Sequence, residues 1–107
     1  MLLAWTTVED RELAEQLATD AVAERVALCA QVEVSPIFSA YRWHGETQTA
    51  REFRIVFKCL PRRRKRLEDW VLARHPYEVP EWVVVRAEHV GEKYLSWARA
   101  SSSNRPL

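Results

Sequence analysis

The chain has 107 residues, of which 48% are hydrophobic, and this length suits one packed domain because a second core would have too little material. The 16 basic and 15 acidic residues nearly cancel, which argues against a general nucleic-acid binder, since such proteins carry a broad positive surface. No apolar run approaches the roughly 18 residues that a membrane-spanning helix needs, so no membrane partner is expected.

The first predicted elements are a short strand and an amphipathic helix. Strand-forming residues run from Leu2 to Thr6, and Thr7 followed three positions later by Asp10 resembles a helix-start box. From Asp10 to about Arg25, leucine and alanine recur at helical spacing and form one narrow apolar stripe. The stripe predicts a helix that packs closely against a sheet.

A long hairpin is predicted next. Residues 28–34 alternate between apolar and polar side chains, which is typical of a half-buried strand. Pro36 has no N–H to donate, so it marks a bulge or an edge position, and strand character resumes over residues 37–43. Residues 44–46, His-Gly-Glu, predict a turn, and the alternation over residues 53–57 predicts an antiparallel return strand.

The second half of the chain predicts a helix, a strand and a last helix. Pro61 suits the start of a helix over residues 61–74, a strand follows over residues 79–87, and a short helix over residues 92–100. Residues 1–100 then form the single domain and residues 101–107 a flexible tail. The predicted fold class is α+β: a ferredoxin-like βαββαβ unit with an antiparallel sheet, an extended hairpin and an added C-terminal helix.

The predicted hairpin is too long for its own domain. At ~3.4 Å per residue, residues 27–43 would extend roughly 55 Å, against the ~30 Å expected of a domain this size. A two-stranded overhang is marginal in water and its edges invite pairing with another chain. We therefore expect residues near 37–53 to pack on a neighbouring subunit.

Four features of the sequence form a recognisable set: Tyr-Arg-Trp-x-Gly at 41–45, Lys58, the block His-Pro-Tyr-Glu-Val-Pro-Glu at 75–81, and Tyr-Leu-x-Trp at 94–97. In this order and spacing they resemble the CutA divalent-cation-tolerance family over nearly the whole chain. The block at 75–81 is the most specific of them. The resemblance implies a ferredoxin-like homotrimer similar in architecture to PII signalling proteins, a role in the response to copper and other divalent metals, and no enzymatic activity.

His75 is the candidate metal ligand. In some bacterial members the proposed copper ligands are a cysteine near the end of the first strand and a histidine pair before Pro-Tyr. Those positions are Trp5 and Arg74-His75 in this sequence, so the resemblance implies at most weak binding of copper or another divalent cation, because strong sites need several N or S donors. The alternative is that His75 caps the preceding helix through its carbonyl groups.

A cleft between subunits is the other candidate site. The resemblance implies that matching polar and aromatic residues line it, and the alternative role for the aromatic ones is simply to pack a subunit interface. A PII-like sensor would hold a small anionic or aromatic ligand there, near Lys58, Glu81 and Trp97. The candidate cleft or interface residues are Cys29, Tyr41, Trp43, Glu52, Lys58, Tyr77, Glu81, Tyr94 and Trp97.

Two further features have structural alternatives to a functional role. Cys29 and Cys59 lack a CxxC spacing and fall on opposite faces of the sheet in simple register. A structural role as small buried residues is therefore favoured for both over metal binding or redox chemistry. The basic run at 62–66 is expected to be a solvated helical face rather than a nucleic-acid patch.

With no basic leader before an apolar stretch at the start, a cytoplasmic location is expected.

Overall fold

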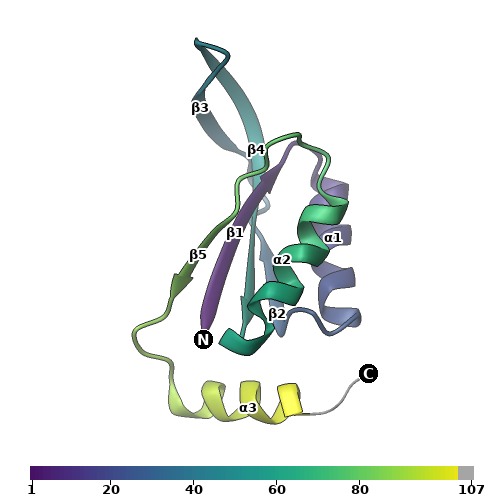
Figure 1. Ribbon diagram of the computed structural model, residues 1–107, viewed down its shortest axis with the longest axis vertical. Helices are drawn as coiled ribbons and strands as arrows, with labels where there is room; N and C mark the ends of the chain where they lie inside the picture. Colours follow the sequence, from purple (N-terminus) through teal and green to yellow (C-terminus); the bar gives the residue numbers. More distant parts are fainter. Residues whose placement is uncertain (104–107) are drawn as a thin grey trace.

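The computed structural model describes residues 1–103 and has the predicted order of elements (Figure 1). The predicted second strand is divided in two, and a short 3₁₀ turn, Pro61–Arg63, precedes the second helix. In chain order the elements are β1 (Leu2–Val8), α1 (Arg11–Ala23), β2 (Cys29–Val32), β3 (Ile37–Trp43), β4 (Glu46–Cys59), α2 (Arg64–Arg74), β5 (Val83–Arg86) and α3 (Glu92–Ser103).

The sheet has the strand order β2-β4-β1-β5, and each of its pairings is antiparallel. Helices α1 and α2 lie on one side of this sheet (Figure 1). The alternation predicted for β4 puts Ile55 and Phe57 under these helices, where both are fully buried against residues such as Leu67. This confirms the ferredoxin-like α+β class.

The opposite side of the sheet, here called the outer face, is also largely apolar. It carries Leu3, Trp5, Val56, Val83 and Val85, which lie in register across three neighbouring strands. Val83 and Val85 remain 49% and 40% exposed. An apolar sheet face left open to water indicates that another surface covers it.

The hairpin of β3 with the first half of β4, here called the arm, projects beyond the helical layer (Figure 1). Its two-residue turn, His44 and Gly45, has positive φ at both positions, 53° and 80°, as the predicted tight turn requires. Among the described residues β3 pairs only with β4, and most of its side chains are exposed, including Phe38 at 63%. The overhang expected from chain length is therefore present.

The predicted bulge at Pro36 is larger than one residue. Residues 33–36 stand opposite only residues 53–54 of β4, because Val32 pairs with Ile55 and Ile37 pairs with Glu52. The interruption takes residues 33–36 out of continuous extended pairing. The longest dimension of the molecule is 46 Å, below the ~55 Å expected of continuous extended chain over residues 27–43.

Three other boundaries differ from prediction. The helix-start box was wrong in its first member, because Thr7 belongs to β1 and Asp10 is the cap, accepting a hydrogen bond from the Glu12 N–H at 3.0 Å. The last strand is β5, Val83–Arg86, rather than residues 79–87. α3 continues to Ser103, so the predicted tail at 101–107 begins with three helical residues, and its remainder lies outside the described residues.

Candidate functional site

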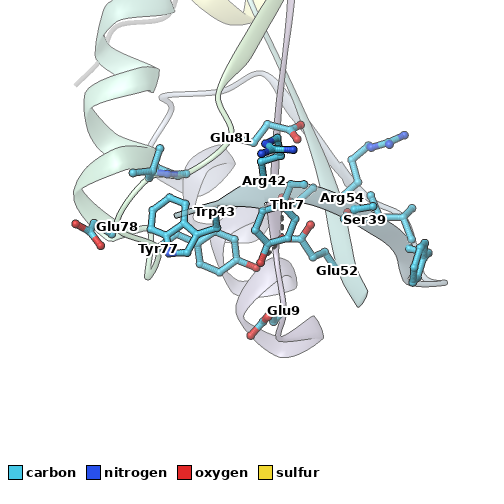
Figure 2. Close-up of a pocket in the computed structure, with 16 residues that line it drawn as sticks. Thr7, Glu9, Ser39, Arg42, Trp43, Glu52, Arg54, Tyr77, Glu78 and Glu81 are labelled. Atoms are coloured by element: carbon cyan, nitrogen blue, oxygen red, sulfur yellow. Dashed lines mark hydrogen bonds between the residues drawn. The ribbon is translucent and has the colours of Figure 1, made fainter. Parts of the chain in front are cut away.

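The candidate site is a cavity of about 900 Å³ between the arm and the loop that follows α2 (Figure 2). β3 contributes Tyr41 and Trp43, β4 contributes Glu52, and the loop contributes Tyr77 and Glu81. Five of the nine residues predicted for a cleft or interface are therefore brought together in one subunit. Alternation places Tyr41 and Trp43 on the Glu52 side of the arm, since their register partners are Gln48 and Glu46.

Glu52 is the central polar group of this cavity. Its side chain is only 8% exposed, and its Oε2 accepts hydrogen bonds from the Tyr77 hydroxyl at 2.8 Å and the Thr7 hydroxyl at 3.2 Å. Figure 2 shows both hydroxyls directed at this carboxylate. Burial, reinforced by the hydrogen bond to Glu52, raises the pKa of the Tyr77 phenol, so the phenol stays protonated and keeps donating at neutral pH.

His75 ties the same loop to the end of β1. Its Nε2 lies 3.0 Å from the Thr7 carbonyl oxygen and 2.9 Å from the Thr6 hydroxyl, and its Nδ1 accepts a hydrogen bond from the Tyr77 N–H at 3.2 Å. A carbonyl can only accept, so Nε2 carries the proton and Nδ1 does not. Burial lowers the pKa of His75 below its ordinary value, which favours this neutral tautomer.

The contacts of His75 bear on its two predicted roles, metal ligand and cap of the preceding helix. The side chain does not cap α2, because it bonds strand β1, and the Trp70 carbonyl is bonded instead by the Arg74 guanidinium at 2.9 Å. A metal at either ring nitrogen would have to displace a hydrogen bond. Within residues 1–103 no group of three His, Cys, Asp or Glu side chains is placed to hold a metal ion.

The two positions that the resemblance pairs with His75 as copper ligands carry side chains with other contacts. Trp5 lies on the outer face between Val56 and Val83. The Arg74 guanidinium lies 4.1 Å from the centre of the Trp70 ring, and the Trp70 indole N–H donates to Glu24 at 2.9 Å. Neither an indole N–H nor a guanidinium offers a lone pair to a metal.

The other four predicted residues form a second cluster near α3. The Lys58 ammonium lies 5.5 Å from the centre of the Tyr94 ring, which stacks on Trp97 at 5.3 Å. Burial raises the pKa of Tyr94, and the adjacent Cys29 thiol adds to the rise. Lys58 is six positions beyond Glu52 on β4, or roughly 20 Å at ~3.3 Å per residue, so one chain does not bring Lys58 and Trp97 to Glu81.

Sequence reasoning missed the two threonines at the end of β1. Thr6 and Thr7 are almost fully buried, and they hold His75 and Glu52 respectively. The available signal was a pair of hydroxyl side chains ending a strand that is otherwise apolar. The sequence pattern assigns Thr6 to the end of the first strand and Thr7 to a helix-start box, so it predicts neither contact.

The cysteines lie apart in the sheet, and the basic run lies at the start of α2. Cys29 is paired with Lys58 and Cys59 with Leu2, so the two free thiols lie on opposite faces of the sheet. In the basic run, Arg64 and Lys65 form ion pairs with acids four residues later in α2. Such pairs are typical of a solvated helix surface.

The fold and the cavity define a small ferredoxin-like α+β protein with a projecting arm and an aromatic, carboxylate-bearing pocket beside it. The family model described as CutA1 divalent ion tolerance protein matches residues 2–101. This chain therefore belongs to the CutA1 divalent ion tolerance family. In the described part of the chain no helix combines the length and apolar character needed to cross a bilayer.

Individual relatives agree with this assignment. The chloroplastic protein CutA of Arabidopsis thaliana is 32% identical over 103 residues, which cover 96% of this chain and 56% of that protein, so the chain spans about half of that relative. The divalent-cation tolerance protein CutA of Salmonella newport is 33% identical over 89% of this chain and 82% of its own length. The solved CutA of Synechococcus elongatus superposes with a TM-score of 0.89 at 34% identity, covering 95% of this chain and 89% of that one.

Proposed function

We propose that this protein serves divalent-cation tolerance as a homotrimer that binds a small ligand in the cavity beside the arm and carries out no catalysis. The observation that carries the proposal is the buried Glu52 carboxylate, held by Tyr77 and Thr7 at the base of a cavity of about 900 Å³. A buried carboxylate fixed by two hydroxyls is a preorganised polar anchor of the kind that small-molecule sites use.

Two exposed surfaces support the trimer. The arm presents Phe38 and Tyr41 to solvent, and the outer face presents Val83 and Val85. Contact with identical subunits would cover both surfaces and close the open side of the cavity. The overlong hairpin predicts such a contact for residues near 37–53.

Light scattering after size-exclusion chromatography tests the trimer. We expect three times the chain mass at low concentration, and a shift toward monomer in Phe38→Asp, which puts a charge in the arm contact. Leu72→Asp is the matched control, because Leu72 is an exposed apolar residue on α2, away from both surfaces. A folded wild-type monomer would exclude the assembly.

A thermal-shift screen tests ligand binding. Nucleotides, amines, organic anions and divalent metals are added to the wild-type trimer. A ligand of the native state at free concentration L stabilises it by RT ln(1 + L/Kd), so the melting temperature rises with the logarithm of ligand concentration above its Kd. A screen in which every class leaves the melting temperature unchanged would count against a ligand-binding role.

Direct metal binding at His75 is the second candidate, supported by the family's divalent-cation tolerance and by an imidazole beside the cavity. We expect it to be weak, since binding must break a hydrogen bond of the ring. Calorimetric titration with copper, zinc and cobalt measures it, and a saturable signal that is lost in His75→Gln would favour this candidate.

A cytoplasmic location is part of the same proposal. Cys29 and Cys59 lie on opposite faces of the sheet as free thiols, which suits a reducing compartment. Fractionation of the source cells, followed by immunodetection, tests this location.

A further inference from the structure

We propose that the ligand of the cavity is a small organic cation, an ammonium or guanidinium group on an apolar body, whose N–H donors bind Oε1 of Glu52. This inference rests on the proposed ligand-binding function and names the chemical class. It differs from the anionic ligand that a PII-like sensor would suggest.

The first argument is the unused oxygen of Glu52. Both hydroxyl donors bind Oε2, and Oε1 accepts no hydrogen bond from the residues that the structure describes. Oε1 is not fully buried, and Glu52 lines the cavity, so a ligand in the cavity can reach this oxygen. A nearly buried carboxylate with one free oxygen is an acceptor for a charged N–H donor.

The second argument is the balance of charge in the lining. The lining includes four carboxylates, those of Glu9, Glu52, Glu78 and Glu81, and two guanidinium groups, those of Arg42 and Arg54. The Arg54 guanidinium is already engaged, because it lies 3.4 Å from the Glu33 carboxylate. The resulting negative potential attracts cations and opposes organic anions.

The third argument concerns the walls, which distinguish an organic cation from a metal ion. Tyr41, Trp43 and Tyr77 contribute aromatic rings to the lining, and aromatic faces attract ammonium and guanidinium groups. A divalent metal needs several oxygen or nitrogen ligands converging on one point. The described chain has no group of three such side chains, so the carboxylates are too dispersed for chelation.

Three probes with similar aromatic skeletons, one cationic, one neutral and one anionic, test the proposal on the wild-type protein in its native assembly. The probes are 2-phenylethylamine, 2-phenylethanol and phenylacetate, titrated calorimetrically at neutral pH and fixed ionic strength. We expect the amine to bind at least about tenfold more tightly than the alcohol, because only the amine forms a charge-assisted hydrogen bond, and phenylacetate to bind most weakly.

Glu52→Gln locates the effect, because glutamine keeps an oxygen acceptor for Tyr77 and Thr7 while removing the charge. The variant should lose the preference for the amine over the alcohol. Glu92→Gln makes the same change of charge in the first turn of α3, outside the cavity, and should keep the preference. Matching circular dichroism and mass in solution show that both variants fold.

Each outcome of the series decides the inference. Equal binding of amine and alcohol, or preference for phenylacetate, overturns the cation proposal while leaving a ligand-binding function intact. Binding by none of the three probes also overturns it. The wider thermal-shift screen tests the ligand-binding function separately, so the two failures are distinguishable.

Discussion

Lowering the pH should destabilise the protein through His75. The neutral imidazole donates from Nε2 to the Thr7 carbonyl and accepts at Nδ1 from the Tyr77 N–H. Protonation of Nδ1 replaces that acceptor with a donor, so the hydrogen bond to Tyr77 is lost. Burial lowers the pKa of His75 in the folded state, and the Thr7 carbonyl and Glu52 oppose that shift without reversing it.

The direction and size of the effect follow from proton linkage. In the unfolded chain His75 titrates near its ordinary pKa of about 6.5, so below that pH the unfolded state binds more protons than the folded state. The stabilisation is therefore complete above about pH 6.5 and is lost as pH falls through the lower folded-state pKa. One proton limits the slope to about 1.4 kcal/mol per pH unit, and we expect roughly half of this because the ring is only part-buried.

Urea unfolding followed by tryptophan fluorescence, between pH 7.5 and 5.5 at one protein concentration, measures the slope. His75→Gln removes the titrating group but keeps an amide donor, and its unfolding free energy should change less over this range. His44→Gln is the matched control, since His44 is exposed at the arm turn. Equal slopes in wild type and His75→Gln, or a stability that rises on acidification, would refute this account.

Three other substitutions test the site, the arm and the core. Tyr77→Phe removes a hydrogen bond to the Glu52 carboxylate and should lower the unfolding free energy by about 1–2 kcal/mol in urea titrations; no change would mean that the bond adds nothing to stability. Gly45→Ala places a side chain at φ 80° and should lower the unfolding free energy by about 1 kcal/mol. His44→Asn should leave it unchanged, because asparagine tolerates this turn. An equal loss in both variants would contradict the turn argument. Leu67→Ala empties a fully buried position and should cost about 2–5 kcal/mol, against less than about 1 kcal/mol for Leu72→Ala, as measured by chemical denaturation.

Much of the fold follows from local pattern. The alternation over residues 53–57 correctly places Ile55 and Phe57 in the core, and the glycine at 45 correctly indicates a tight turn with positive φ. The same parity puts Cys29 and Cys59 on opposite faces. These features depend on neighbours close in sequence, which is why the residues alone predict them.

Boundaries were less predictable where tertiary contacts override local preference. Thr7 has the chemistry of a helix cap, yet it pairs with Arg54 in the sheet and bonds Glu52. The strand expected over residues 79–87 shrinks to β5, Val83–Arg86, because pairing with β1 extends only from Trp5 to Leu2.

The candidate site shows the same division. The family-like block at 75–81 contains Tyr77, and Glu52 is among the candidate cleft residues, but sequence order does not say that the phenol bonds that carboxylate across 25 positions of chain. Nor could it separate the cavity from the cluster of Cys29, Lys58, Tyr94 and Trp97 near α3.

The amino-acid sequence by itself determined the order of elements, the faces of the strands and the overlong arm, because periodicity and turn chemistry act over a few residues. Only the tertiary structure decided which polar groups meet, that both nitrogens of His75 are engaged, and that one oxygen of Glu52 receives no donor from residues 1–103. Those outcomes depend on strand register and on the path of the loop after α2, which bring together side chains distant in the chain.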